Sequence, residues 1–556
     1  MEITKGLQQV LQGNTKFIVV TGGVCSSIGK GVLVSSLGVL LKHAGYSVSV
    51  MKMDPYLNVD PGTMSPLVHG EVFVTADGAE TDLDLGHYER MLGEPLTRDA
   101  SVSAGQVFEE ILQGEREGAF LGKCIQLVPH VVDTIKKRLF NVALSHDVDF
   151  VMLEIGGTVG DLEGVTFLEA VRQLKMDLGH TRVMHCHLSY VPFLSWTGEV
   201  KTKPTQHSVS TLKQAGLAPD ALFLRADKAI EQESAEKLAI MCGVSRQFIF
   251  QVMTFNPVYQ LFCELQKQGV DKRVQEHFKL APRTSDLTEW TKFIELIKNP
   301  VGQVTIGLVA KYVGSNDPYI SVVEAIKAAG YHCQQKVNIV VVEAEALEKE
   351  TYAGDGKAWT QLKALDGIVV PGGFDKRGIE GKISAVRFAR ENNIPYFGLC
   401  LGMQMMIIEF ARSLLQLDDA NSTEFNQETK APVIAMLAEQ VGLSRKGGTM
   451  RLGSYQCNLV PGTKASAAYA QPTVAERHRH RYEVNNSYRE ALENVGAVFS
   501  GIYVEKNLVE ITELEGHPFM LGTQFHPEFQ STPLKVHPLF KAFMEAVVGR
   551  QKAKGN

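Results

Sequence analysis

Apolar runs alternate with helical patterns along the first half of the chain. Residues 17–21 and 48–53 are short apolar runs that predict strands, and residues 32–42 between them have the apolar spacing of a helix. Residues 149–155 (DFVMLEI) form a continuous apolar run typical of a strand buried on both faces. This alternation predicts a parallel, doubly wound α/β sheet with its ligands at the carboxyl ends of the strands.

The pattern is interrupted between about residues 280 and 300, where the chain becomes polar and a helix is predicted at 287–298. A new alternation follows, with a strand at 304–309, a helix at 320–329 and a strand at 337–342. We therefore predict two α/β domains. The predicted parts are a domain at 1–280, a linker at 281–300, a second domain at 301–549 and a frayed tail at 550–556.

Bulk composition agrees with two domains and excludes several classes of protein. A length of 556 residues exceeds what one hydrophobic core normally supports, and 44% apolar with 21% charged residues is typical of a folded globular chain. A net charge of −6 argues against nucleic-acid binding. The eight cysteines include no CxxC pair, which fits a reducing compartment. With no signal segment and no long apolar run, we expect a cytoplasmic protein without a membrane partner.

The ten residues 395–404 (PYFGLCLGMQ) carry the strongest indication of chemistry. A short strand ends in Gly-Leu-Cys-Leu-Gly, and a helical pattern at 403–415 begins almost at once. This is the pattern of a nucleophile elbow, where glycines flank the reactive residue because the turn is too sharp for side chains. The helix that starts behind Cys400 is expected to favour its thiolate form. A buried structural cysteine is the alternative, and the flanking glycines favour the nucleophile.

A thiolate nucleophile needs a base and a group that orients the base. His526 and Glu528 supply both if Pro527 holds the segment extended, because side chains two residues apart then share a face. A third piece is the run 366–374 (DGIVVPGGF), a predicted strand that ends in Pro-Gly-Gly. Such a loop can direct backbone N–H groups toward an oxyanion.

The N-terminal half contains a glycine-rich turn between a predicted strand and helix, at residues 22–31 (GGVCSSIGKG). Phosphates bind at this position, and Lys30 supports that interpretation over an ordinary turn. The turn departs from the standard P-loop, because five residues separate Gly23 from Gly29 and Gly31 replaces the usual Ser or Thr. A magnesium ligand must therefore come from elsewhere in the chain.

Acidic and basic residues elsewhere complete the predicted nucleotide site. Glu154 ends the 149–155 strand, where P-loop enzymes place a metal-holding acid, and Asp82 and Asp84 would share a face if extended. Magnesium suits such oxygen ligands and ATP. Residues 201–206 (KTKPTQ) are predicted to form a basic loop able to hold a triphosphate.

Together the elbow, the His-Pro-Glu run and the Pro-Gly-Gly loop resemble class I, triad-type glutamine amidotransferase domains. The resemblance implies that Cys400 attacks the glutamine carboxamide, His526 shuttles protons and Glu528 orients His526. Gly373 would contribute to glutamine and oxyanion binding, and glutamine would also contact Leu401, Gly402, Met403, Gln404, Glu424 and Arg481.

Six longer motifs resemble the CTP synthase family from about residue 16 to residue 543. They are MKMDPYLNVDPGTMSP from Met51, HGEVFV from His69, DGAETDLDLGHYER from Asp77, EIGGTVGD from Glu154, GEVKTKPTQHSV from Gly198 and ERHRHRYEVNN from Glu476. The resemblance implies a synthetase domain of the dethiobiotin-synthetase P-loop type. That domain would phosphorylate UTP at O4 with ATP, and ammonia from glutamine would displace the phosphate to give CTP.

The family resemblance also assigns nucleotide-binding residues. ATP would contact Ser27, Ile28, Gly29, Lys30, Gly31, Val32, Lys52 and Asp84, with Mg2+ on Asp84 and Glu154. UTP, and CTP as feedback inhibitor, would contact Ser26, Asp161, Leu162, Glu163, Lys201, Thr202, Lys203, Pro204, Thr205, Gln206 and Lys237. The resemblance further implies a homotetramer and activation of glutamine hydrolysis by GTP.

Two segments depart from the family pattern. Residues 253–255 (MTF) replace a stretch that the family places near the adenine of ATP, which bears on the adenine contacts. Residues 438–446 are short for the family in the lid over the GTP and glutamine site, which bears on the GTP response.

Two other interpretations remain at this point. A P-loop ligase with a glutaminase half, such as a cobyrinate amidase, shares the five-residue glycine spacing. Its glutaminase half is not expected to carry the His-Pro-Glu acid, nor its ligase half the KTKPTQ motif. A catalytically silent scaffold that kept the fold is the second alternative, and the complete Cys-His-Glu set argues against it.

Overall fold

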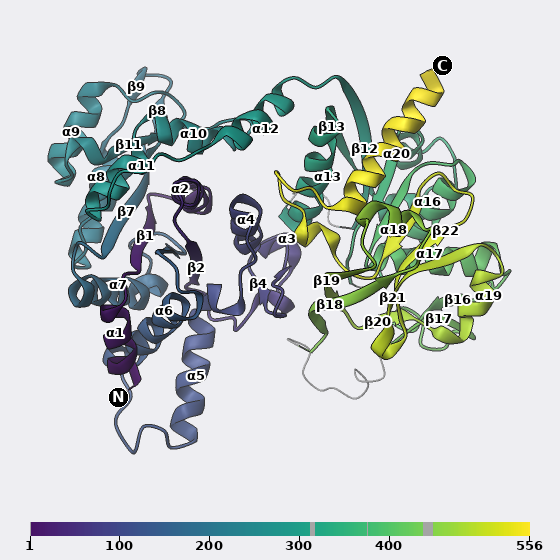
Figure 1. Ribbon diagram of the computed structural model, residues 1–556, viewed down its shortest axis with the longest axis horizontal. Coiled ribbons are helices and arrows are strands. Elements are labelled where there is room, and N and C mark those ends of the chain that lie inside the picture. Colours follow the sequence, from purple (N-terminus) through teal and green to yellow (C-terminus); the bar gives the residue numbers. More distant parts are fainter. Residues whose placement is uncertain (1, 312–316, 375, 437–448, 556) are drawn as a thin grey trace. The chain divides into compact units, whose positions relative to one another are not determined.

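In a computed structural model, which describes residues 2–311, 317–374, 376–436 and 449–555, the chain forms two compact units (Figure 1). The N-terminal unit comprises Met1–Asp60 and His87–Ile294, and the C-terminal unit comprises Pro61–Gly86 and Glu295–Asn556. The division after Ile294 falls inside helix α12 (Thr288–Lys298), which the sequence predicted at 287–298. The segment Pro61–Gly86 lies within the first predicted domain in sequence, but it packs with the C-terminal unit.

The N-terminal unit contains one seven-stranded sheet in which every strand pair is parallel. The strands predicted at 17–21, 48–53 and 149–155 are confirmed, each within one or two residues of its observed ends. Across the sheet the order is β11 (Ile249–Val252), β10 (Ala221–Arg225), β7 (Val183–Tyr190), β1 (Lys16–Gly23), β6 (Phe150–Ile155), β2 (Val48–Asp54) and β5 (Ser101–Ser103).

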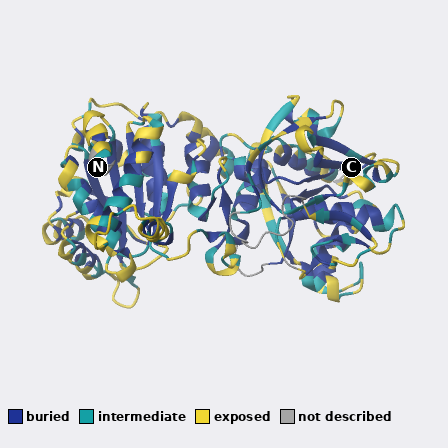
Figure 2. Ribbon diagram, turned by 90° about the horizontal axis from the view of Figure 1, so that it is seen from below, coloured by how far each residue is buried: buried dark blue, intermediate teal, exposed yellow. Residues whose placement is uncertain are grey.

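The central strands β1 and β6 are buried along their whole length, as the continuous apolar run predicted for β6. Buried residues form the interior of the unit in Figure 2. Phe17 and Val19 of β1 belong to a core cluster that includes side chains of α1 (Glu2–Gln12), α6 (Val132–His146) and α7 (Val165–Leu178). Helix α2 (Lys30–His43) follows β1 directly and packs with α10 (Gln260–Lys267) and α11 (Val270–His277). The sheet therefore holds its strand ends, and the loops after them, on a rigid support.

The C-terminal unit is built on a nine-stranded mixed sheet. Its first five strands are parallel, and the last four continue the sheet antiparallel. The strands predicted at 304–309 and 337–342 and the helix predicted at 320–329 are confirmed as β12, β13 and α13 (Ile320–His332). The order is β13 (Gln335–Glu343), β12 (Gly302–Ala310), β14 (Gly367–Val370), β15 (Tyr396–Leu399), β23 (Met520–Thr523), β22 (Leu508–Leu514), β21 (Ala497–Tyr503), β18 (Arg451–Leu459) and β19 (Thr473–His480).

Two local predictions are wrong. Residues 201–206 were expected to form a loop, but helix α8 (Lys203–Gln214) begins at Lys203, with Pro204 in its first turn. Proline is tolerated there because the first N–H groups of a helix have no intrahelical partner. The tail predicted to be frayed from residue 550 instead continues helix α20 (Pro538–Gly555). In the described parts of the chain, neither α20 nor any other helix is long and apolar enough to cross a membrane.

Candidate active site

Cys400 occupies a sharp turn between strand β15 and helix α17 (Leu401–Ser413), as the nucleophile-elbow pattern predicted. Its backbone has φ 51° and ψ −100°, a conformation that few non-glycine residues adopt. The flanking glycines are required sterically. A Cβ on Gly398 would lie 2.6 Å from the Gly402 backbone, and one on Gly402 would lie 2.1 Å from the Val370 carbonyl oxygen. The turn therefore holds the thiol at the start of a helix.

His526 and Glu528 follow strand β23, which pairs with β15 and so ends beside the elbow. The His526 Nδ1 and Glu528 Oε1 atoms are 2.7 Å apart, as predicted. The expected extended segment is wrong, however, because Pro527–Gln530 forms a short 3-10 helix. The tight turn still brings Glu528 to the ring, while Phe529 stacks on the imidazole with ring centroids 5.0 Å apart. The geometry thus fixes the orientation of His526.

The electrostatic environment of His526 favours its protonated form. Burial alone would lower the pKa of His526, but the charges of Glu528 and Cys400 raise it to about 10. A protonated imidazole beside the sulfur is the partner that a thiolate nucleophile requires. Near neutral pH, such an imidazolium can also donate its proton to a leaving group.

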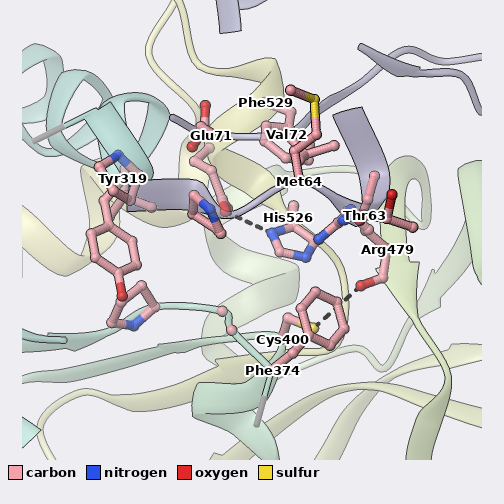
Figure 3. Close-up of a pocket in the computed structure, with 18 residues that line it drawn as sticks. Thr63, Met64, Glu71, Val72, Tyr319, Phe374, Cys400, Arg479, His526 and Phe529 are labelled. Carbon is pink, nitrogen blue, oxygen red and sulfur yellow. Dashed lines mark hydrogen bonds and ion pairs between the residues drawn. The ribbon is translucent and has the colours of Figure 1, made fainter. Parts of the chain in front are cut away.

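A cavity of about 240 Å³ opens at these residues, all within the C-terminal unit (Figure 3). Gly372 forms the part of the cavity wall next to Cys400 and His526. A Cβ on Gly372 would lie 2.9 Å from His526 Cε1 and 3.7 Å from Cys400 Cβ. The volume lies just below the roughly 300–1,000 Å³ of typical ligand pockets and suits a small polar molecule. Its lining residues are Gly62, Thr63, Met64, Pro66, Glu71, Val72, Pro318, Tyr319, Val322, Pro371, Gly372, Gly373, Phe374, Cys400, Arg479, His526, Glu528 and Phe529.

The sequence analysis missed two parts of this cavity. One is the wall formed by residues 62–72, from the segment that packs with the C-terminal unit. The other is Arg479, whose Nε is 2.8 Å from Glu80 Oε1 and whose guanidinium lies 4.9 Å from the centre of the Phe374 ring. The alternation along β19 could have indicated Arg479, since residues of one parity share a face of a strand.

The residues predicted to bind glutamine are only partly gathered at this cavity. Gly373 lines it. The side chain of Gln404, in the first turn of α17, donates from Nε2 to the Tyr482 carbonyl oxygen at 2.9 Å, and Leu401, Gly402 and Met403 are buried in the same turn. Glu424 follows β16 (Ala420–Ser422) and Arg481 lies between β19 and β20 (Tyr482–Val484); both are half-buried. Their roles in glutamine binding stay predictions.

In the N-terminal unit, the glycine-rich turn connects β1 to α2, as predicted. Gly29 and Ser27 adopt the left-handed conformation, with φ 97° and φ 54°. Ile28 is buried, Ser26 is exposed, and Gly31 and Val32 lie in the first turn of α2. Lys30 is buried and donates from Nζ to the Gly157 carbonyl oxygen at 2.6 Å. The lysine is thus held at the carboxyl ends of β1 and β6, where parallel sheets bind ligands.

Lys52 and Glu154 are register partners on the neighbouring strands β2 and β6. Lys52 Nζ lies 3.5 Å from Glu154 Oε1 and 3.6 Å from Asp54 Oδ1, and all three side chains are buried. The carboxylates of Asp54 and Glu154 provide the hard oxygen donors that Mg2+ prefers. Mg2+ commonly completes its coordination shell with water and phosphate oxygens. Among the residues described, no group of three or more His, Cys, Asp or Glu side chains is arranged to hold a metal by itself.

The predicted pairing of Asp82 and Asp84 on an extended face is wrong. Asp82 precedes helix α4 (Leu83–Leu92), and its Oδ1 accepts the Asp84 backbone N–H at 3.0 Å, a capping interaction. Asp82 also lies 3.0 Å from His69 Nε2. Asp84 is half-buried in the first helical turn, within Pro61–Gly86. Its role as a magnesium ligand stays a prediction.

The residues predicted to bind UTP follow the ends of β6 and β7. Asp161 accepts the Thr158 N–H at 2.8 Å, and Leu162 and Glu163 are exposed in the short helix Leu162–Gly164. In the KTKPTQ motif, Thr202, Thr205 and Gln206 are buried, Lys203 is exposed, and Lys201 and Pro204 are half-buried. Lys237 is exposed on α9 (Gln232–Cys242).

The two segments that depart from the family pattern differ in what the structure shows. The Met253 carbonyl oxygen accepts a hydrogen bond from Arg225 at 3.1 Å, so the backbone after β11 is anchored. The predicted lid at 438–446 lies outside the described residues.

A buried cysteine on an elbow, a His-Glu pair and an α/β sheet are the features of a triad-type glutamine amidotransferase. In agreement, a family model described as "Glutamine amidotransferase class-I" matches residues 316–546, and one described as "CTP synthase N-terminus" matches residues 16–280. A CTP synthase of Caldanaerobacter subterraneus is 51% identical over 533 residues, covering 96% of this chain and 98% of the relative.

A CTP synthase of Carboxydothermus hydrogenoformans is 50% identical over 538 residues, covering 97% of this chain and 99% of that relative. Among solved structures, the glutaminase domain of Trypanosoma brucei CTPS with bound acivicin matches 44% of this chain and 94% of its own, at 36% identity and a TM-score of 0.40. On the full-length matches, the chain belongs to the CTP synthase family. The predicted family and fold class are confirmed, and the cobyrinate amidase alternative is excluded.

Replacing Glu528 with Gln tests the electrostatic part of the triad. Glu528→Gln keeps a hydrogen-bonding side chain but removes the charge that raises the pKa of His526. The imidazolium should then lose its proton at lower pH, so glutamine hydrolysis should fall on the order of 10²-fold near pH 8. A pH profile of glutaminase kcat should show its alkaline limb shifted to lower pH. An unshifted profile would contradict the role of Glu528.

Proposed function

We propose that this chain makes CTP by ATP-dependent amination of UTP, with nitrogen released from glutamine by Cys400, His526 and Glu528. Family membership supports the overall reaction, which is a step of pyrimidine nucleotide synthesis. The assignment to residues rests mainly on one observation: the elbow cysteine, the His-Glu pair and the Pro-Gly-Gly loop line a single cavity.

In the glutaminase reaction, Cys400 Sγ attacks the side-chain amide carbon of glutamine. The resulting oxyanion is stabilised by backbone N–H groups of the Pro-Gly-Gly loop, including Gly373, and of Leu401 at the start of α17. His526 donates its proton to the departing ammonia, leaving a thioester on Cys400. His526 then takes a proton from water, which attacks the thioester and releases glutamate.

In the synthetase reaction, UTP O4 attacks the γ-phosphorus of ATP, and ammonia then displaces the phosphate from C4. Lys30 and Lys52 stabilise the charge on the transferred phosphoryl group. Asp84 and Glu154 would hold Mg2+, which when bound neutralises charge on the triphosphate. ATP would lie along Ser27–Val32, and UTP would contact Ser26, residues 161–163, residues 201–206 and Lys237.

The remaining proposals concern regulation and organisation. We assign the synthetase domain to residues 1–280 and the amidotransferase domain to residues 301–549, with Pro61–Gly86 of the first stretch packing in the C-terminal unit. Glutamine would contact Gly373, residues 401–404, Glu424 and Arg481. The cytoplasmic enzyme would work as a homotetramer that is activated by GTP and inhibited by CTP.

The decisive assay follows CTP absorbance in mixtures of UTP, ATP and Mg2+, with glutamine and ammonia compared side by side. CTP should form from either nitrogen source, and only the glutamine reaction should depend on Cys400. CTP formation from neither source would contradict the proposed function.

Replacing Glu154 with Gln tests the predicted metal site. Glu154→Gln preserves size but removes a carboxylate charge, so CTP synthesis from ammonia should fall about 10²-fold or more, with a higher Mg2+ requirement. Glu115→Gln, which changes an exposed acid on helix α5 (Ala104–Arg116), is the matched control for the Mg2+ requirement. A wild-type Mg2+ titration for Glu154→Gln would exclude Glu154 as a ligand.

A further inference from the structure

Two buried lysines anchor the ends of the loop Pro371–Phe374. Lys382 on helix α16 (Ile379–Glu391) has no exposed surface, and its Nζ donates to the Pro371 carbonyl oxygen at 3.1 Å. Lys311, directly after β12, is 5% exposed, and its Nζ donates to the Phe374 carbonyl oxygen at 2.9 Å. Both contacts are made to backbone carbonyl groups, so each lysine fixes the main chain and leaves the side chains of the loop unaffected.

This loop forms the wall of the cavity nearest to the triad. Pro371, Gly372, Gly373 and Phe374 all line the cavity together with Cys400. Gly372 lies so close to the triad that a Cβ there would be 2.9 Å from His526 Cε1. A rotation of either glycine peptide would therefore change which backbone group faces the reacting atoms.

Because the peptide bond is planar, the contact of Lys382 with the Pro371 carbonyl also sets the direction of the Gly372 N–H. In a trans peptide, the C=O of one residue and the N–H of the next point in opposite directions. When Lys382 holds the Pro371 carbonyl on its own side, the Gly372 N–H must point away from Lys382. Two successive glycines would otherwise rotate easily, because they have access to conformations closed to other residues.

Burying a lysine side chain completely has an unfavourable desolvation free energy. Charged residues are almost never fully buried unless they are paired, and an apolar side chain would pack α16 without a desolvation cost. Burial, and after it the nearby charge of Lys311, lower the pKa of Lys382 well below its usual value.

We infer that Lys382 is a positioning residue for glutamine hydrolysis: its bond to the Pro371 carbonyl holds the Pro371–Gly372 peptide in the orientation that lets the Gly372 N–H stabilise the oxyanion. This inference rests on the proposed role of Cys400 as the nucleophile. Lys382 does not touch the substrate. It acts through the Pro371–Gly372 peptide.

The test replaces Lys382 with Met, which is one atom shorter and keeps an unbranched apolar stem but removes the donor. Loss of one oriented oxyanion donor lowers kcat by about 10²–10³-fold, so glutaminase kcat of Lys382→Met should fall by about 10²-fold. The KM for glutamine should change less than about 3-fold, because binding and transition-state stabilisation are separable. Alkylation of Cys400 by iodoacetamide, which develops no oxyanion, should keep its wild-type rate, as should CTP synthesis from ammonia.

Val386→Ala is the matched control, since Val386 is also fully buried and lies one turn further along α16. It should destabilise the core while leaving glutaminase kcat within about 3-fold of wild type. If Lys382→Met does not fold, Lys382→Gln, which retains a shorter donor, should show a smaller loss of kcat with the same unchanged alkylation rate.

Two results would overturn the inference. One is wild-type glutaminase kcat in a folded Lys382→Met or Lys382→Gln protein. The other is a parallel loss of kcat and iodoacetamide reactivity, which would mean that Lys382 supports Cys400 itself. Failure of Cys400 as the nucleophile is detected separately, by glutaminase activity that survives in Cys400→Ala.

Discussion

Cys400→Ala should abolish CTP synthesis from glutamine while leaving synthesis from added ammonia close to wild type. Without the sulfur no thioester forms, and loss of a nucleophile in triad enzymes lowers kcat by about 10⁴–10⁶-fold. Synthesis from ammonia should persist because Lys30, Lys52 and Glu154 lie in the other unit. Glutamate release and CTP absorbance, measured in parallel, distinguish the two activities.

Cys457→Ala is the matched control for this experiment. Cys457 is also buried in the C-terminal unit, on β18, and burial raises the pKa of its thiol, so it should be unreactive. Its replacement should leave glutamine-dependent synthesis within a few-fold of wild type. If Cys400→Ala lost CTP synthesis from both glutamine and ammonia, the two sites could not be separated by mutation.

Lys30→Ala should abolish synthesis from glutamine and from ammonia alike. The buried ammonium is held 2.6 Å from the Gly157 carbonyl oxygen, at the strand ends where the triphosphate is proposed to bind. Removing a cation that stabilises a transferred phosphoryl group should cost at least about 10³-fold in kcat. CTP formation with saturating ammonia measures the effect without involving the triad.

Lys42→Ala, at the opposite end of the same helix, controls for loss of a lysine from α2. Lys42 is partly exposed and donates to the Leu92 carbonyl oxygen at 2.7 Å, so its loss should have little effect on turnover. Ammonia-dependent activity that survives in Lys30→Ala would exclude the phosphate role.

Much of the fold could be predicted because local patterns there coincide with tertiary structure. Residues 150–153 are all apolar because β6 is buried on both faces. The elbow could be recognised because its geometry excludes side chains at Gly398 and Gly402. The Nδ1–Oε1 contact of His526 and Glu528 was also predicted, although for an extended segment instead of a 3-10 turn.

Other features have no local pattern. The two-residue strands β3 (Phe73–Val74) and β4 (Glu80–Thr81) are too short for periodicity, and their partners Arg477 and Arg479 lie about 400 positions away in sequence. The full burial of Lys382 is equally hidden, since a lysine on an amphipathic helix normally faces solvent. Such features depend on which distant elements meet, so a single sequence does not indicate them.

The assignment of Pro61–Gly86 to the C-terminal unit means that the glutaminase cavity is built from two separate stretches of the chain. A fragment beginning near residue 300 would keep Cys400, His526 and Glu528, but Phe529 would lose the ring of Phe73, Arg479 would lose Glu80, and Ser321 would lose Glu71. Transplanting this half into another enzyme therefore requires two pieces of chain. For the same reason, a mutation in the first hundred residues can impair a reaction whose nucleophile lies three hundred residues later.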